Sequence, residues 1–282
     1  MPTISLTMGN VHYEKAGPDG GRPVVLIHGY AMGGSLWRPL TERLAAGGYS
    51  CVAPTWPLGA HTEPMRREPP LTIEAIAAMV GELLDELALD DVVLVGNDTG
   101  GAIAQVVATS TPERLGALVL TSCDAFEHFP PPILKPFIAA AKFAPTFTAA
   151  LQPRRTRLGR ERAYGALAHD DIDDLVTAWL EPALTNSGVR SDLRRLTASL
   201  SRQTTVQAGE RLPRFTKPAL IAWSKDDAFF PIEDAQRLAA TLPDARLEVI
   251  ERARTFSMID QPDELARLIA GFAAGRADRR AA

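Results

Sequence analysis

The residue best placed to do chemistry is an aspartate at the tip of a predicted strand-to-helix turn. Asp98 follows the apolar run Val92–Val95 and precedes Ala102–Ala108, a run with the composition of a helix. Glycines stand at positions 96, 100 and 101 around it. This spacing fits a turn so tight that strand and helix nearly touch, with one side chain held at the tip on strained backbone.

Asp98 has two interpretations in that position. The tip of such a turn lies at a helix N-terminus, where backbone N–H groups and the dipole favour negative charge. The layout is that of a nucleophile elbow, usually Gly-x-Ser-x-Gly, with aspartate in place of serine. With an ordinary pKa of about 3.9, an aspartate needs no base to be ionised at pH 7. The alternative is a plain turn in which Asp98 caps the helix.

A second glycine-rich loop follows another predicted strand. The apolar run Pro23–Ile27 ends in His28-Gly29-Tyr30-Ala31-Met32-Gly33-Gly34. Backbone N–H groups in such a loop are free to point into a cavity, where they can supply half of an oxyanion hole. The alternative is a flexible connection between strand and helix.

The elements that must position these residues alternate along the chain. Apolar strand-like runs alternate with helical runs from Pro23 to Phe272. We therefore expect a mostly parallel, doubly wound α/β sheet of about eight strands. Because sites in such sheets lie at the carboxyl ends of the strands, four polar residues are expected at one edge: His28, Asp98, Asp124 and Asp227.

One long segment interrupts this alternation. Residues 125–214 hold helical pieces rich in Ala, Leu and Arg and no strand-like run. We expect them to form a helical lid over the active edge, with residues 1–124 and 215–282 as the core. The polar end, residues 275–282, is expected to fray.

Composition excludes several classes of function. The chain has 282 residues, 46% of them apolar, a net charge of −4 and a pI near 5.8. We therefore expect neither nucleic acid nor a membrane as partner. The beginning shows no signal-peptide pattern, which favours a cytoplasmic location. Cys51 and Cys123 are expected as buried thiols, and no metal or cofactor is implied. The expected partner is a small-molecule substrate, and a homodimer is an alternative to a monomer.

With the elbow, the His-Gly loop, the strand order and the lid, the chain resembles the α/β-hydrolase superfamily over essentially its full length. An elbow aspartate is similar to that of the haloalkane dehalogenases, haloacetate dehalogenases and epoxide hydrolases. In those families the carboxylate attacks carbon, and a histidine-activated water cleaves the resulting ester. The resemblance implies that Asp98 is the nucleophile and that the N–H groups of Thr99 and Tyr30 form the oxyanion hole.

The resemblance also implies an acid. The segment Trp223–Pro231 is similar to the loop in which an aspartate four residues before a proline orients the histidine, which points to Asp227. Asp124 occupies the alternative acid position of some dehalogenases. Its other interpretation is a cap for the first turn of the lid.

The chain departs from the superfamily at the histidine. Thr255 stands where the catalytic histidine is expected, and no histidine follows His169. Threonine cannot act as a base near neutral pH. The dehalogenase halide ligands are replaced by Thr99 and Tyr30, and the predicted lid holds one tyrosine where epoxide hydrolases use two. His61 and His128 are the candidates for a displaced base.

Three functions follow. The first is hydrolysis of an ester, halide or epoxide-type bond in a small, largely apolar organic substrate through Asp98. The second is non-hydrolytic acid/base chemistry at Asp98, as in a cyclase, isomerase or lyase. The third is ligand binding without catalysis. The predicted substrate pocket comprises His28, Asn97, Phe126, His128, Trp179, Phe229, Arg254 and Thr255.

Overall fold

The apolar runs of the sequence form the strands of a single sheet in the computed structural model, which describes residues 1–274. Within these residues the sheet has eight strands in the order β1-β2-β4-β3-β5-β6-β7-β8. The strands are β1 (Thr3–Leu6), β2 (Gly9–Ala16), β3 (Pro23–Ile27), β4 (Ser50–Pro54), β5 (Val92–Asp98), β6 (Leu115–Cys123), β7 (Ala219–Ser224) and β8 (Ala245–Ile250).

The sheet is parallel except at one edge. β4, β3, β5, β6, β7 and β8 pair in parallel, whereas β1 with β2 and β2 with β4 are antiparallel. This confirms the predicted mostly parallel sheet. The edge hairpin turns at Thr7 and Met8, because Leu6 pairs with Gly9, and not at Gly9-Asn10 as the glycine suggests. The expected fraying of residues 275–282 concerns residues outside those described.

Successive side chains of the central strands enter two different hydrophobic clusters. In β3, Val25 and Ile27 pack with one cluster, whereas Val24 and Leu26 pack with the other. This alternation is the two-residue period of a strand, and both faces are apolar because helices cover both. Each fully buried Val, Leu or Ile contributes about 1.5–3 kcal/mol by leaving water.

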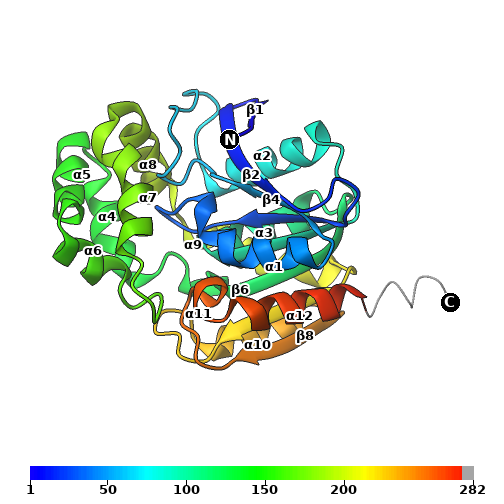
Figure 1. Ribbon diagram of the computed structural model, residues 1–282. Coiled ribbons are helices and arrows are strands. Elements are labelled where there is room, and N and C mark those ends of the chain that lie inside the picture. The colour runs from blue at the N-terminus through cyan, green and yellow to red at the C-terminus, as the bar shows by residue number, and fades with distance from the viewer. Residues whose placement is uncertain (275–282) are drawn as a thin grey trace.

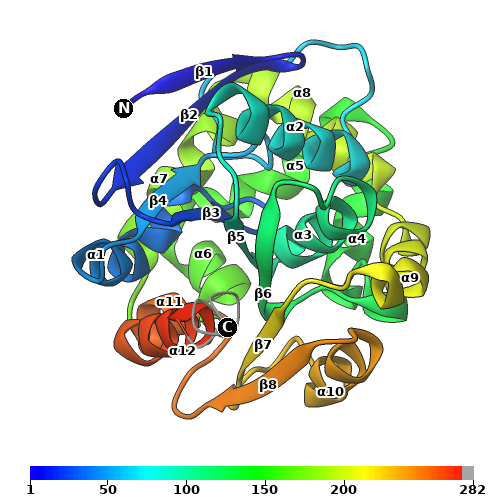
Figure 2. The ribbon, with the colours of Figure 1, turned by 90° about the vertical axis from the view of Figure 1, so that its right-hand side faces the viewer.

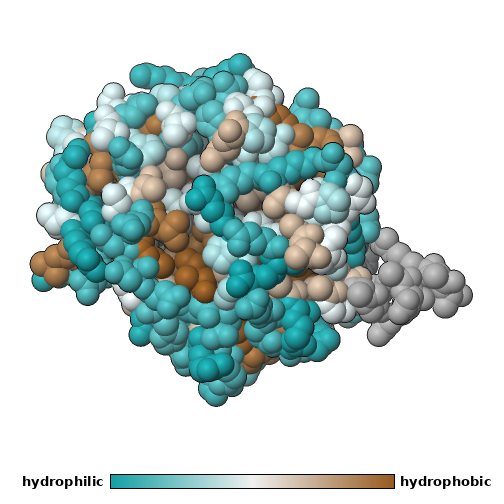
Figure 3. Space-filling model, viewed as in Figure 1, coloured by the Kyte–Doolittle hydropathy of each residue, from teal (hydrophilic) through white to brown (hydrophobic). Residues whose placement is uncertain are grey.

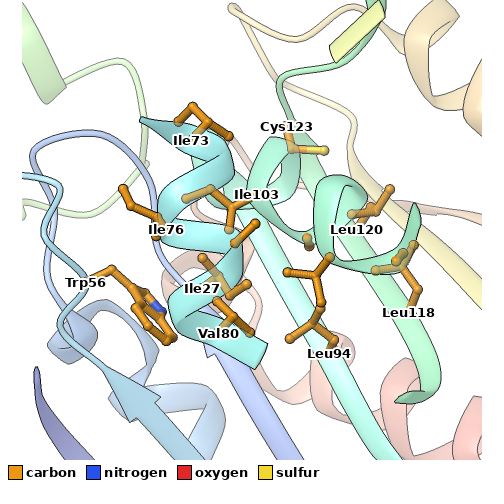
Figure 4. Close-up of a cluster of buried hydrophobic side chains, with 14 of the residues drawn as sticks. Ile27, Trp56, Ile73, Ile76, Val80, Leu94, Ile103, Leu118, Leu120 and Cys123 are labelled. Carbon is orange, nitrogen blue, oxygen red and sulfur yellow. The ribbon is translucent and has the colours of Figure 1, made fainter. Parts of the chain in front are cut away.

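Helices cover both faces of the sheet (Figure 2). α2, α3 and α10 lie on one face, where Ile27, Ile76, Val80, Leu94 and Ile103 belong to one buried cluster (Figure 4). α1, α11 and α12 lie on the other. The bounds of these helices are α1 (Arg38–Ala46), α2 (Ile73–Glu86), α3 (Thr99–Ser110), α10 (Ile232–Thr241), α11 (Ser257–Asp260) and α12 (Pro262–Ala274).

Between β6 and β7 the chain forms helices and no strand. Most of these helices gather beside one end of the sheet (Figure 1) and enclose a small cluster that includes Phe147, Leu151 and Leu193. α9 differs, because it packs against α3 of the core. The helices are α4 (Lys135–Ala140), α5 (Ala144–Leu151), α6 (Arg157–Tyr164), α7 (Asp173–Thr185), α8 (Ser187–Ser199) and α9 (Arg202–Arg211). That residues 125–214 act as a lid stays a prediction.

No helix within residues 1–274 has both the length and the hydrophobicity to cross a bilayer.

Candidate active site

The turn between β5 and α3 has the strained geometry that its glycines predict. Asp98 has φ 53° and ψ −132°, outside the regions that side chains favour. A Cβ on Gly100 would lie 2.1 Å from the carbonyl oxygen of Ile27, and one on Gly101 would lie 2.2 Å from Cβ of Cys123. Only glycine therefore lets the helix approach the sheet this closely. Strain of this kind costs about 1–3 kcal/mol and is typical of functional sites.

Two backbone N–H groups hold one oxygen of the Asp98 carboxylate. Oδ1 accepts hydrogen bonds from the N–H of Thr99 at 2.6 Å and from the N–H of Tyr30 at 3.0 Å. A Cβ on Gly29 would lie 2.1 Å from the same Oδ1, so glycine is required in that loop too. The structure thus brings Asp98, Thr99 and Tyr30 together.

Burial raises the pKa of Asp98. The N–H groups of Thr99 and Tyr30 oppose this rise, and the charge of Asp227 adds to it. Asp98 therefore gives up its proton at a higher pH than an exposed aspartate does.

Asp124 lies behind Asp98, away from the cavity. Its carboxylate accepts a hydrogen bond from the Thr99 hydroxyl, at 2.9 Å to Oδ2, whereas its Oδ1 is buried without a partner among the described residues. Burial and the charge of Asp98 raise the pKa of Asp124 well above its ordinary value. The predicted cap of the first lid turn is absent, because the turn Phe126–His128 has no side-chain cap.

Asp227 occupies the loop after β7, where the acid was expected. Its Oδ1 accepts hydrogen bonds from the N–H groups of Phe229 at 2.8 Å and Phe230 at 2.9 Å. Its Oδ2 is buried and has no hydrogen-bond partner in the described part of the chain. Burial raises the pKa of Asp227, and the nearby hydroxyls of Ser122 and Thr255 are among the groups that oppose the rise.

Thr255 is fully buried beside this carboxylate. Its hydroxyl has no partner among residues 1–274, and the same holds for the hydroxyl of Ser257 in the same segment. The carbonyl of Thr255 accepts a hydrogen bond from Nδ2 of Asn97 at 2.9 Å. Asn97 and Thr255 therefore bind each other behind the cavity and do not line it. This corrects their predicted place in the substrate pocket.

A cavity of about 320 Å³ opens above Asp98, between the helices that follow β6 and the loops that follow β3, β5 and β7. Of the predicted site residues, Asp98, Thr99, Tyr30 and Phe229 line it. Apolar side chains gather on the surface where these helices meet the core (Figure 3). Most of the cavity wall is likewise apolar, and includes Phe137, Leu151, Leu167, Leu180, Leu193 and Phe230.

None of the chain's five histidines lines this cavity. The buried His28 accepts a hydrogen bond from the N–H of Trp56 at its Nε2 and lies 3.0 Å from the carbonyl of Gly29 at its Nδ1. Burial lowers the pKa of His28 to about 4, so the ring is neutral at pH 7. It supports the fold of the loop and does not face the substrate, contrary to its predicted pocket position.

Both candidates for a displaced base pair with carboxylates elsewhere. Nε2 of the buried His61 lies 3.2 Å from Asp192, and Nδ1 of His128 lies 2.6 Å from Asp234. Neither histidine reaches the cavity, so the predicted position of His128 in the pocket is wrong.

Three further residues predicted for the pocket lie elsewhere, since none of them lines the cavity. Phe126 stacks under the guanidinium of Arg237, 3.9 Å from its ring centre. Trp179 donates its indole N–H to Oγ of Ser35 at 2.8 Å and joins α7 to the loop after β3. Arg254 donates to the carbonyls of Gly165 and Ala168 and does not pair with Asp98.

Sequence reasoning missed three polar residues of the cavity wall: Arg154, Arg162 and Tyr164. Tyr164 donates its hydroxyl to the carbonyl of Ala31 at 3.0 Å. The two arginines belong to a run with five arginines between positions 154 and 162. Nothing in that run distinguishes a cavity residue from a solvent-exposed one.

Known proteins resemble the chain over nearly its whole length. A 2-hydroxy-6-oxononadienedioate/2-hydroxy-6-oxononatrienedioate hydrolase 1 of Dechloromonas aromatica (strain RCB) is 27% identical over 274 residues, which covers 93% of this chain and 90% of the relative. Haloalkane dehalogenase 2 of Mycobacterium tuberculosis (strain ATCC 25618 / H37Rv) is 29% identical over 272 residues, with coverage of 93% and 90%.

Solved structures share the fold. An α/β hydrolase fold protein from Burkholderia ambifaria superposes with a TM-score of 0.80 at 20% identity, covering 95% of this chain and 96% of that one. A putative ancestral haloalkane dehalogenase gives 0.79 at 17% identity, with coverage of 98% and 99%. The sequence pattern of the alpha/beta hydrolase family matches residues 24–268. This chain, with its strained elbow and its mostly parallel sheet, is therefore a member of the alpha/beta hydrolase family.

Proposed function

We propose that this protein hydrolyses a small, largely apolar organic substrate, with an ester, halide or epoxide-type bond, through a covalent intermediate on Asp98. The placement of the Asp98 carboxylate carries the proposal. Its Oδ1 is held by the backbone N–H groups of Tyr30 and Thr99, whereas its Oδ2 accepts no backbone hydrogen bond within residues 1–274. Because Asp98 lines the cavity, Oδ2 is the oxygen available to a ligand.

In the first step, a lone pair of Oδ2 forms a bond to the electrophilic carbon. The bond from that carbon to its leaving group breaks, and the leaving group takes the electron pair. A halide or an ester's alkoxide departs, whereas the oxygen of an epoxide stays on the neighbouring carbon and takes a proton from solvent. With a halide or an epoxide the product is an ester on Asp98 whose carbonyl oxygen is Oδ1, and with an acyl ester it is the corresponding anhydride of Asp98. Because the carboxylate is already ionised, this step needs no base.

In the second step, water attacks Cγ of the ester, the bond between Cγ and Oδ2 breaks, and the product alcohol leaves with Oδ2 and a proton, so that Asp98 regains its carboxylate with an oxygen from water. The negative charge that develops on Oδ1 falls on an oxygen already bound by two N–H groups, so the oxyanion hole is preorganised. The water must lose a proton, and no histidine lines the cavity. Asp227 is the base we propose. It does not line the cavity itself, but Phe229 and Phe230, whose N–H groups hold its Oδ1, do, and its Oδ2 is unpartnered within residues 1–274. Without an imidazole between Asp227 and the ester, this step is slow.

A specific observation favours a second candidate function. The raised pKa of the buried Asp98 suits it to move a proton to or from a bound molecule, and such chemistry needs no water activation. A non-hydrolytic acid/base reaction at Asp98 would turn over substrate without a covalent adduct.

For partners we propose a small-molecule substrate and no nucleic acid, with a homodimer as the alternative to a monomer. We also propose a cytoplasmic location.

Intact-protein mass spectrometry tests the proposed nucleophile. Wild type and Asp98→Asn are incubated with bromohexane, epoxyhexane and nitrophenyl butanoate, and any adduct is located by tandem mass spectrometry of peptides. The proposal predicts a mass gain on the Asp98 peptide of wild type only. A gain that maps elsewhere, or that persists in Asp98→Asn, would refute it. Turnover without any adduct would favour the acid/base function.

A further inference from the structure

The cavity above Asp98 contains positive charge that the proposed chemistry does not use. Its charged lining residues are Asp98, Arg154 and Arg162, and most of the other lining side chains are apolar. Arg162 is exposed. Arg154 lies in the short turn Gln152–Arg155 and is only partly exposed.

Arg154 differs from the other arginines of its segment in its partners. Arg157 pairs with Asp171, and Arg160 makes a two-pronged pair with Asp173. Arg154 has no carboxylate partner among residues 1–274, and its guanidinium makes one hydrogen bond, from Nη1 to the carbonyl of Ala150 at 2.8 Å. A guanidinium has five N–H donors, so most of those on Arg154 are free for a ligand.

The orientation of this guanidinium is fixed by an aromatic ring. Cζ of Arg154 lies 4.2 Å from the centre of the Phe137 ring, which also lines the cavity. Stacking of this kind holds the planar group flat and leaves its edge exposed for two parallel hydrogen bonds to a carboxylate or phosphate. Burial lowers the pKa of Arg154, which shows that its charge is incompletely solvated. An anion bound beside the guanidinium would stabilise this incompletely solvated charge.

Tyr164 lies near both the guanidinium of Arg154 and the carboxylate of Asp98. Its pKa responds to the charges of both Arg154 and Asp98, so both lie within electrostatic reach of one side chain of the cavity wall. A ligand that fills the cavity therefore meets a carboxylate at one place and a guanidinium at another, with apolar walls between them.

We propose that Arg154 binds an anionic group of the substrate, so that the preferred substrates are organic anions with an apolar body and an electrophilic carbon that reaches Asp98. A carboxylate fits the two-pronged geometry of the guanidinium edge. This inference rests on the cavity being the substrate site of the proposed function, but not on the covalent step itself.

Calorimetric titration tests the anion site separately from the chemistry. The parent protein is Asp98→Asn, which cannot form the ester and does not repel an anion. The probes are hexanoate and hexanamide, which share an apolar body and differ in charge. We expect hexanoate to bind the parent about ten- to a hundredfold more tightly than hexanamide, because hydrogen bonds to charged groups are the strong ones.

Three variants made in this parent assign the effect. Arg154→Gln is expected to abolish the preference for hexanoate and to leave the affinity for hexanamide unchanged. Arg157→Gln is the matched control, because Arg157 belongs to the same segment but does not line the cavity. Arg162→Gln is expected to change the preference little. Thermal unfolding checks that each variant folds.

The other outcomes overturn the proposal. Equal binding of the two probes by the parent, or no binding of hexanoate at millimolar concentration, would show that the cavity has no anion site. A preference that survives Arg154→Gln, or that disappears in Arg162→Gln instead, would show that Arg154 is not its basis. An absent adduct on wild type together with a preference that depends on Arg154 would leave the anion site standing and refute only the nucleophile.

Discussion

The two sides of the site differ in how their polar atoms are satisfied. On the nucleophile side, comprising Asp98, Thr99 and Tyr30, the strained aspartate is held by two backbone hydrogen bonds. On the acid side, comprising Asp227, Thr255 and Ser257, one carboxylate oxygen and two hydroxyls are buried without a partner within residues 1–274. Such atoms are rare, because each costs about 1–3 kcal/mol.

The chain departs from the pattern of its superfamily on the acid side. The groups that we propose form and stabilise an ester on Asp98 lie together at the turn after β5. The group that would activate water is not, because Thr255 stands in the expected position of the histidine. We therefore expect the two chemical steps to differ in rate, with the first faster than the second.

The largest expected effect is on the nucleophile side. Asp98→Asn should reduce adduct formation by about a millionfold, the usual cost of losing a nucleophile. The amide oxygen can still accept the two N–H groups, so the fold should be preserved. Because the folded-state pKa of Asp98 is raised, its ionisation costs stability as pH rises above the unfolded value, and the variant should be at least as stable at pH 7. Rates of bromide release, with unfolding curves, measure both effects. Substantial release by the variant would contradict the assignment.

The second-largest expected effect is on the acid side, at Thr255. Thr255→His should raise steady-state turnover by about a hundred- to ten-thousandfold, which is the usual contribution of a general base. The larger side chain costs about 1–3 kcal/mol in a closely packed site. Thr255→Gln is therefore the matched control, since it adds similar bulk without a base. Equal turnover in the two variants would show that water activation does not limit the reaction.

The pH dependence of adduct formation tests the ionisation of Asp98. Only the carboxylate attacks, so the rate should fall about tenfold per pH unit below the pKa of Asp98. Burial raises that pKa, so the fall should begin above the pH at which an exposed aspartate titrates. Asp227→Asn removes a nearby negative charge and should move the midpoint to lower pH. A midpoint that moves up in this variant, or does not move, would contradict the electrostatic coupling of the two sides.

The smallest effect separates structure from catalysis. His61→Ala should destabilise the fold by about 1–3 kcal/mol, because it leaves the buried Asp192 with one hydrogen bond fewer, and should leave adduct formation and turnover unchanged. Replacing His128, whose side chain is exposed, by alanine should lower the free energy of unfolding by less than about 1 kcal/mol. Denaturant unfolding and rate measurements are made on the same samples. Loss of turnover in either variant would show that the histidine reaches the site after all.

The fold was predictable because its signals are local. The run Val92–Val95 is apolar on both faces, the glycines around Asp98 leave few alternatives to a tight turn, and strands alternate regularly with helices. The turn of the edge hairpin does not follow from residue type alone. Gly9 is a turn residue by type, yet it lies in β2 opposite Leu6, and Met8 and Val11 on either side of it are buried in the core.

Asp98, Thr99 and Tyr30 could be placed together from the sequence because the strand order places them together. Asp98 and Thr99 are adjacent, and Tyr30 follows a strand that pairs with β5. The cavity wall depends instead on how the helices after β6 pack. Phe126 and Trp179 suit a pocket by type, yet both pack elsewhere. Arg154 reaches the cavity from a run in which every arginine looks alike.

The lifetime of the ester on Asp98 tests the contrast between the two sides most directly. Wild type and Thr255→His are treated briefly with bromohexane, freed of reagent, and followed by intact-protein mass spectrometry. We predict an ester that persists on wild type and decays about a hundred- to ten-thousandfold faster in Thr255→His. Equal lifetimes in the two proteins, or no ester on wild type at any time, would contradict the account.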